Sequence, residues 1–381
     1  MRSLDTARAA CETHHPGLCA ALAEIPLPGR ECPGSPVIDL FRKHDGAGLL
    51  VPPEYSGAGA DTLEAVRVLR GLASYSPSLG AAVTMHHFTA AMLFALAAGT
   101  DRLTGRQLEL LSRIAPGRLL LASGWAEGRP GQNILRPSLR AVPSGDGGWL
   151  LNGGKKPCSL SHSMDLLTAS VALEDGADGS SALAVALVPA DTSGVSTHPF
   201  WSSPVLAAAE SDEVRLTDVR LADELIIRTI PDDPGRLDDL QTAGFVWFVL
   251  LICSVYTGVG SELADRVLRG GRGAATDRAA VAIGVESAVA LLEGAARAVR
   301  DGLSGDDAVA AVLVARYAAQ RALAQATDLA VELLGGTAFI ASPEIACLSS
   351  AVRAIAFHPP SRGSAAQPLL EYFSGGPLVL S

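Results

Sequence analysis

The chain has 381 residues, of which 48% are hydrophobic, 5% aromatic and 18% charged, with 30 Lys and Arg against 40 Asp and Glu for a net charge of −10. This composition excludes a disordered tail protein, a collagen and a small disulfide-stapled domain. No basic stretch stands out, so we expect no nucleic-acid partner.

Residues 1–118 are expected to form an N-terminal helical domain. Residues 61–64 read Asp-Thr-Leu-Glu, which resembles the capping box that begins a helix, and Leu and Val then recur at helical spacing up to Pro77. Residues 81–96 predict a second, nearly apolar helix that carries His86 and His87. An apolar helix with a short polar segment either lies in the hydrophobic core or lines a pocket.

Residues 119–235 predict a small β-domain or barrel, because short apolar runs alternate there with Gly, Asp, Asn and Pro. A turn is expected at 144–148 and a linker at 231–235. The predicted strands are 119–122, 149–151, 166–171, 183–188 and 213–221.

Residues 236–381 predict a C-terminal helical bundle, so the fold class is α+β with a helical domain on each side of the β-domain. Gly335 and Gly336 are expected to end the last long helix. The most apolar run, 245–256, is too short to span a bilayer, so we expect a buried helix and no membrane. The long helices are predicted at 240–268, 278–303 and 306–334.

Six cysteines lie scattered along the chain, and the first residues lack the apolar segment of a signal peptide. Both features favour a cytoplasmic protein with reduced thiols. The cluster of Cys11, His14, His15 and Cys19 has ligand chemistry for a soft metal, but its spacing matches no zinc signature. We therefore predict no metal site.

No P-loop, HExxH or GxSxG motif is present, and no glycine-rich dinucleotide loop follows a predicted strand. Gly258 and Gly260 lie inside a predicted helix, which argues against a nucleotide loop there. The best acid–base candidates are His86, His87 and His358, because imidazole titrates near neutrality. For each of them a structural role in the core is the alternative.

Five segments occur in the order in which one known family carries them. They are 48–59 (GLLVPPEYSGAG), 127–133 (EGRPGQN), 152–155 (NGGK), 214–221 (VRLTDVRL) and 332–336 (ELLGG). On these segments the sequence resembles the acyl-CoA dehydrogenase family along nearly its whole length.

The resemblance implies an FAD-containing homodimer or homotetramer that oxidises an acyl thioester, carried on CoA or on an acyl carrier protein. In the family, a carboxylate base removes the α-proton while a hydride passes to the flavin. The resemblance places cofactor contacts at Trp125, Ala126, Gln132, Ser159, Glu332 and Gly336.

The departures from the family pattern bear on this expectation. His358 stands where the catalytic Glu is usual, and residues 247–250, where some branches carry that Glu, contain no carboxylate. Ala126 replaces a hydroxyl residue, and residues 157–159 (Pro-Cys-Ser) keep only the hydroxyl of the family's Trp-x-(Thr/Ser). Glu332 replaces a Gln, which puts a negative charge where the family binds pyrophosphate.

Three functions follow as alternatives. The first is an FAD-dependent oxidoreductase acting on an acyl thioester, and the second is a monooxygenase that uses externally reduced flavin, with His87 and His358 at its pocket. The third is a relative that has lost redox chemistry, either a non-redox enzyme or a binding protein. The substitutions at the expected flavin contacts favour a relative without redox chemistry, whereas the two histidines favour the monooxygenase.

Overall fold

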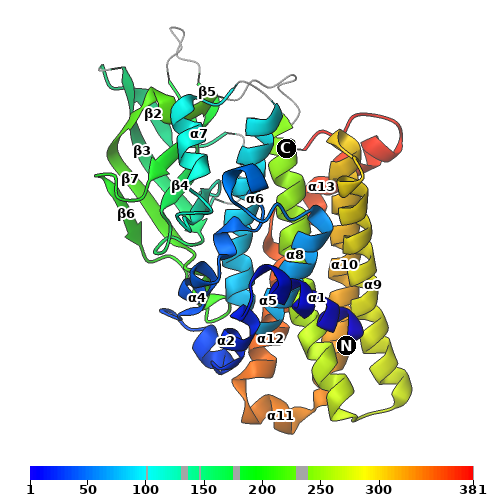
Figure 1. Cartoon of the computed structure of the whole chain (residues 1–381). Coiled ribbons are helices and arrows are strands. Elements are labelled where there is room, and N and C mark those ends of the chain that lie inside the picture. The colour runs from blue at the N-terminus through cyan, green and yellow to red at the C-terminus, as the bar shows by residue number, and fades with distance from the viewer. Residues whose placement is uncertain (100–101, 130–135, 146, 175–180, 229–238, 381) are drawn as a thin grey trace.

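The computed structural model describes residues 1–99, 102–129, 136–145, 147–174, 181–228 and 239–380. Figure 1 shows a β-sheet on one side of the molecule and long helices on the other, with α6 between them. Helices precede the strands in the chain and follow them again. The predicted α+β class, with a central β-region between two helical regions, is confirmed.

The N-terminal region is helical, as predicted. Asp61 accepts a hydrogen bond from the Glu64 N–H at 2.8 Å, and the Glu64 carboxylate accepts one from the Asp61 N–H at 2.9 Å, so the capping box is confirmed. Pro77 begins the next helix because proline fits the first helical position, where no amide donor is needed. The helices are α1 (Arg2–His14), α2 (Leu18–Ala23), α3 (Leu27–Arg30), α4 (Val37–Lys43), α5 (Thr62–Tyr75), α6 (Pro77–Gly99) and α7 (Gly105–Ser112).

The strands form one sheet in the order β6-β7-β3-β2-β4-β5-β8, with β1 parallel to β4. All five predicted strands are found, whereas the three to four residues of β2, β6 and β8 are too few for a periodic signal. The predicted turn is found, since the Ser144 N–H donates to the Gly148 carbonyl at 2.9 Å, and the predicted linker lies outside the described residues. The strands are β1 (Leu121–Gly124), β2 (Arg140–Pro143), β3 (Gly148–Cys158), β4 (Leu166–Leu173), β5 (Ala182–Pro189), β6 (Val195–His198), β7 (Asp212–Ala222) and β8 (Ile226–Arg228).

The C-terminal region begins with three long helices, as predicted. Gly335 ends α10 with φ 85°, but Gly336 begins α11, so only the first of the two glycines ends a helix. By length and composition, α6, α8 and α9 are long and apolar enough to cross a membrane, and in α6 and α8 78% of that apolar window is buried inside the protein. The helices are α8 (Asp239–Gly270), α9 (Ala275–Arg300), α10 (Gly305–Leu334), α11 (Gly336–Ala341), α12 (Pro343–Arg353) and α13 (Arg362–Phe373).

Helix α6 packs against both the sheet and α8. The Leu121 N–H of β1 donates to His86 Nδ1 at 3.1 Å, and His86 Nε2 lies 2.9 Å from the Ala47 carbonyl. Burial lowers the pKa of His86 to about 4, so the ring is neutral and serves this contact. In α8, a Cβ on Gly258 would meet the Arg70 carbonyl at 2.3 Å, so this glycine serves helix packing and not a nucleotide loop.

A buried carboxyl joins α3 to the start of α6. Glu31 accepts hydrogen bonds from the Ser76 hydroxyl at 2.5 Å, the Ser78 hydroxyl at 2.6 Å and the Ser78 N–H at 3.1 Å. Burial nevertheless raises the pKa of Glu31 from 4.5 to about 7.

This raised pKa predicts a pH-dependent stability. Between pH 4.5 and about 7 the folded chain holds a proton on Glu31 that the unfolded chain has released, so the free energy of unfolding falls as pH rises through this window. Glu31→Gln is expected to flatten the slope of the thermal midpoint against pH, while Glu24→Gln, at an exposed position, keeps it. Equal slopes in wild type and Glu31→Gln would contradict the assignment.

Candidate functional site

His358 lies in the turn between residues 354–357 and α13, and its ring meets two long helices. Nε2 is 2.6 Å from the Tyr256 hydroxyl of α8, and the Phe248 ring packs edge-on against the imidazole at 5.7 Å. Phe88 of α6 packs edge-on against Phe248 at 5.4 Å. The structure thus brings together α6, α8 and the C-terminal segment at one cluster, which we call the His358 cluster (Phe88, Phe248, Tyr256 and His358).

A buried arginine fixes the backbone that carries His358. Arg316 of α10 is 1% exposed and donates to the carbonyls of Pro359 at 2.9 Å, Ile355 at 3.4 Å and His358. The neighbouring Tyr317 hydroxyl donates to the Pro360 carbonyl at 3.0 Å. Since these bonds reach backbone carbonyls, the turn is held independently of the His358 side chain.

Burial and the charge of Arg316 lower the pKa of His358 to about 3, so the imidazole is neutral at ordinary pH. Burial raises the pKa of Tyr256, so its hydroxyl keeps its proton. With Nε2–H donating to the Tyr256 oxygen, the Nδ1 lone pair remains as an acceptor; with the Tyr256 hydroxyl donating to Nε2, Nδ1 carries the hydrogen and is a donor. In both tautomers the pair is uncharged and lies in an aromatic cluster.

His87 does not join this cluster. Its ring is fully buried and packs edge-on against Phe41 at 5.7 Å and His86 at 5.1 Å. Neither ring nitrogen has a hydrogen-bond partner among the described residues, and burial lowers the pKa of His87 well below its usual range. The expected pairing of His87 with His358 is therefore not found, because Phe88, one residue on, takes the position that faces α8.

Trp125, Ala126 and Ser159 lie where β1 and β3 end side by side. The Lys156 N–H donates to the Ala126 carbonyl at 2.9 Å, and the Ser159 hydroxyl lies 2.9 Å from that of Ser211. The indole N–H of Trp125 is buried and has no acceptor among the described residues. The predicted contacts on this edge of the sheet are thus near one another.

A buried ion pair joins two of the recognised sequence segments. Lys155 Nζ lies 2.8 Å from Glu127 Oε1 and 3.0 Å from the Ser170 hydroxyl, and the Glu127 carboxylate also accepts from Ser138 and from the Leu139 N–H. Burial alone would raise the pKa of Glu127, but the bonds from Lys155 and Ser138 bring it down to about 2. Glu127 and Lys155 thus fix the end of β1 to β3.

The other predicted cofactor contacts do not reach this edge within one chain. Glu332 and Gly336 are exposed at the junction of α10 and α11, at the far end of the helical region from the sheet (Figure 1). Arg272 Nη1 donates to the Leu334 carbonyl beside them at 3.2 Å. Gln132 lies outside the described residues.

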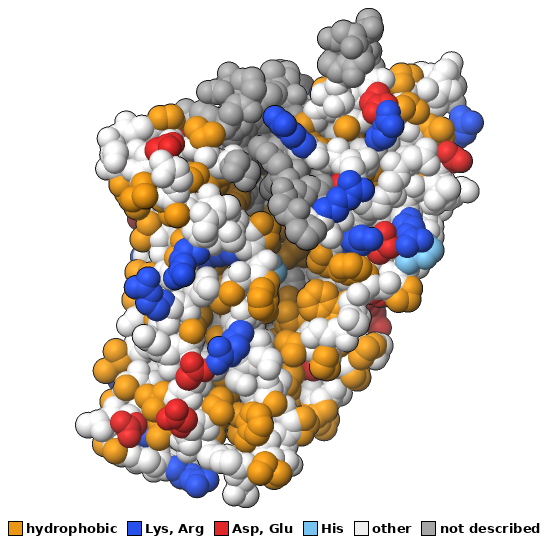
Figure 2. Space-filling model, turned by 180° about the vertical axis from the view of Figure 1, so that it is seen from behind, with side chains coloured by type: hydrophobic (Ala, Val, Ile, Leu, Met, Phe, Trp, Pro, Cys, Tyr) orange, Lys and Arg blue, Asp and Glu red, His pale blue; other side chains and the backbone are white. Residues whose placement is uncertain are grey.

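Figure 2 shows the face opposite to that of Figure 1, with a hollow in its middle between the sheet and the long helices. Hydrophobic side chains line the hollow, and Lys and Arg side chains lie on both sides of it. Such a surface suits an apolar ring system or chain that carries anionic groups.

Sequence reasoning missed Tyr256 and Arg316. Tyr256 ends the apolar run 245–256, where a hydroxyl in an otherwise apolar run is a weak signal. Arg316 is a stronger signal. It is a single charged residue between the buried Leu313 and Ala319 of α10, and a buried charge needs hydrogen-bond or ionic partners.

Comparison with known proteins adds to this geometry. Residues 4–114 match the family model described as acyl-CoA dehydrogenase, N-terminal domain. The chain is 62% identical over 383 residues to isobutylamine N-hydroxylase of Streptomyces viridifaciens, and the alignment covers 100% of both chains.

Solved structures share the fold over nearly the whole chain at low sequence identity. KijD3 in complex with FMN and dTDP-3-amino-2,3,6-trideoxy-4-keto-3-methyl-D-glucose has a TM-score of 0.83 and 22% identity, covering 98% of this chain and 94% of that chain. XiaF from Streptomyces sp. in complex with FADH2 and glycerol has a TM-score of 0.79 and 18% identity, covering 99% and 97%.

Proposed function

The chain belongs to the acyl-CoA dehydrogenase family, as a divergent member without the usual Glu, and from this premise we propose that it is a flavin-dependent monooxygenase that hydroxylates the nitrogen of a small primary amine. The observation that carries the proposal is the 62% identity over the full length of isobutylamine N-hydroxylase. This supports the second sequence-based expectation, the monooxygenase, better than the first, the oxidation of an acyl thioester.

The presence of His358 where the family usually carries its catalytic Glu agrees with a monooxygenase. Removing the weakly acidic α-proton of a thioester requires a strong, well-placed base, whereas a His358 with a pKa of about 3 is a weak one. An amine needs only to be bound with its nitrogen lone pair free. A neutral imidazole that accepts a hydrogen bond from the amine N–H suits that task.

The residues at the sheet edge fit a flavin. The buried indole N–H of Trp125 has no acceptor among the described residues, and a heteroaromatic ring with carbonyl and nitrogen acceptors would supply one. Ser159 adds a hydroxyl on the same edge. Bound there, a reduced flavin would supply the two electrons with which one atom of O2 is transferred to the amine nitrogen and the other is released as water. The complexes of fold relatives include both FMN and FADH2, and we propose FAD for this chain.

The His358 cluster accounts for the protein's own part in the reaction. An alkylamine is protonated in water, with a pKa of about 10, but a dry aromatic site favours its neutral form. Phe88 and Phe248 keep water from one side, and His358 orients the nitrogen by accepting from its N–H. Tyr256 holds the imidazole in place through the 2.6 Å bond.

The test is oxygen incorporation. Purified protein supplied with FAD, a flavin reductase, NADPH and isobutylamine in air should form the N-hydroxylamine, and isotope-labelled oxygen should appear in the product by mass spectrometry. As a control, a short-chain acyl-CoA should neither bleach the bound flavin nor form an enoyl product. Bleaching by the acyl-CoA together with no hydroxylamine would overturn the proposal and restore the dehydrogenase.

A further inference from the structure

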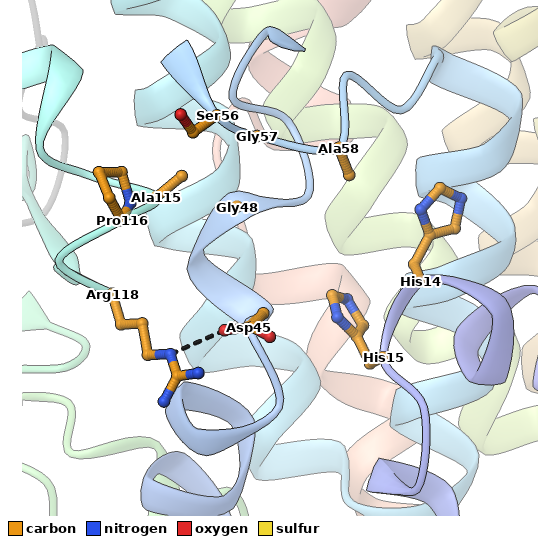
Figure 3. Close-up of a pocket in the computed structure, with 10 residues that line it drawn as sticks. All are labelled: His14, His15, Asp45, Gly48, Ser56, Gly57, Ala58, Ala115, Pro116 and Arg118. Carbon is orange, nitrogen blue, oxygen red and sulfur yellow. Dashed lines mark hydrogen bonds and ion pairs between the residues drawn. The ribbon is translucent and has the colours of Figure 1, made fainter.

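A cavity of about 420 Å³ opens in the N-terminal region and shares no residue with the His358 cluster. It lies between the end of α1, the loop that runs from Asp45 to Ala58, and the segment that ends at Arg118 (Figure 3). The volume is ample for a small organic molecule.

One wall of the cavity carries a buried hydrogen-bond acceptor without a partner. His15 is 1% exposed, and its Nδ1 lies 3.2 Å from the His44 carbonyl. A carbonyl only accepts, so Nδ1 carries the hydrogen, and the Nε2 lone pair accepts no hydrogen bond from any described residue. Figure 3 shows the ring pointing into the space between Asp45 and Ala58.

The imidazole is held in this position. The Phe41 ring packs edge-on against it at 5.8 Å, and burial lowers the pKa of His15 to about 4, so the ring is neutral. The wall thus presents a neutral acceptor and not a cation.

Five amide donors around the cavity are already used within the protein. The N–H groups of Gly48, Ser56, Gly57, Ala58 and Arg118 donate to carbonyls at 2.9 to 3.2 Å, and Pro116 has none. Arg118 Nε donates to Asp45 Oδ1 at 2.7 Å, which ties the main cation of the lining to its carboxylate. Among the described residues of the lining, the buried side-chain atom without a hydrogen-bond partner is His15 Nε2, an acceptor, which favours a ligand that donates a hydrogen bond there.

The backbone around the cavity is unusual. Asp45, Ser56 and Arg118 have φ of 57°, 63° and 52°, which makes three of the seven described non-glycine residues with positive φ. Such conformations cost energy and gather where a site needs a defined shape.

We propose that this cavity binds a small primary ammonium ion, which donates to His15 Nε2 and to the Asp45 carboxylate. An ammonium group has three donors and no acceptor, so it can donate both to the unpartnered His15 Nε2 and to the Asp45 carboxylate. The inference stands apart from the proposed hydroxylation, since it depends on a different set of residues.

The test uses the full-length protein with isotope-labelled histidine, whose ring signals are followed by NMR. Isobutylammonium chloride, added at constant ionic strength, should shift the His15 signal in a saturable way, and isobutanol, which has the same shape without the charge, should not. His15→Gln assigns the signal. Asp45→Asn should weaken binding about tenfold, since it removes one charge-assisted hydrogen bond, and Asn tolerates the positive φ there.

The two proposals fail separately in this experiment. A His15 signal that does not move, that moves equally with isobutanol, or that is unaffected by Asp45→Asn overturns the ammonium site. A His358 signal that shifts while His15 stays fixed overturns it too and leaves the hydroxylation standing. A His15 shift in a protein that forms no hydroxylamine keeps the site and overturns the proposed function alone.

Discussion

Replacing His358 by glutamine is expected to lower kcat for amine hydroxylation by about 100-fold, the loss typical when the reacting group is no longer held in position. The fold should persist, because Arg316 and Tyr317 hold this turn through backbone carbonyls that the substitution keeps. The measurement is hydroxylamine formed at saturating amine and flavin, with the reductase in excess.

Two further variants define what this result means. Tyr256→Phe keeps the ring and removes the 2.6 Å bond to Nε2, so kcat should fall by about fivefold, as for one hydrogen bond worth about 1 kcal/mol. His162→Gln, at an exposed histidine bonded to Asp212, should leave kcat unchanged. If His358→Gln behaves like His162→Gln, the amine is oriented by another group.

The pH profile gives an independent check on His358. The neutral ring is the active form and its pKa is lowered to about 3, so it stays in that form at every pH above about 4. The imidazole should therefore add no loss of kcat near pH 6.5, where an ordinary histidine would. Any ionisation seen at higher pH belongs to a group other than His358.

The long-range order of the fold was predictable because each region has a strong local pattern. The Asp61–Glu64 box locates the start of α5 correctly, and the apolar runs locate the long helices to within a few residues. β2, β6 and β8 were missed because three or four residues show no period. Their existence depends on pairing with strands far away in the sequence.

The site was predictable only in part. His358 was found through its place in a family pattern, but its hydrogen bond to Tyr256 joins residues 102 positions apart, which no local pattern reveals. His87 was expected at the same pocket because it lies on an apolar helix and because some relatives with this fold carry histidines near the pocket. Helix geometry decides otherwise, since neighbouring positions on α6 lie about 100° apart and Phe88 faces Phe248.

Lys155→Met is expected to destabilise the protein by about 3–5 kcal/mol, the usual result of breaking a buried ion pair on one side. The lysine is fully buried, so the methionine fills much of its volume but leaves the Glu127 carboxylate without the ammonium at 2.8 Å. The thermal midpoint should fall by about 5 °C or more. Glu127→Gln in the same chain should recover part of the loss, because the two changes share one interaction.

The adjacent lysine provides the matched control. Lys156 Nζ lies 3.2 Å from Glu213 on the partly exposed side of the same strand, where an ion pair contributes less than about 1 kcal/mol, so Lys156→Met should change the midpoint little. Equal changes of the thermal midpoint in the two variants would mean that the Glu127–Lys155 pair stabilises the fold no more than an exposed ion pair does. If the pair holds the end of β1 against β3, Lys155→Met should also weaken flavin binding below its melting temperature, because Trp125 and Ser159 on this edge then lose their fixed spacing.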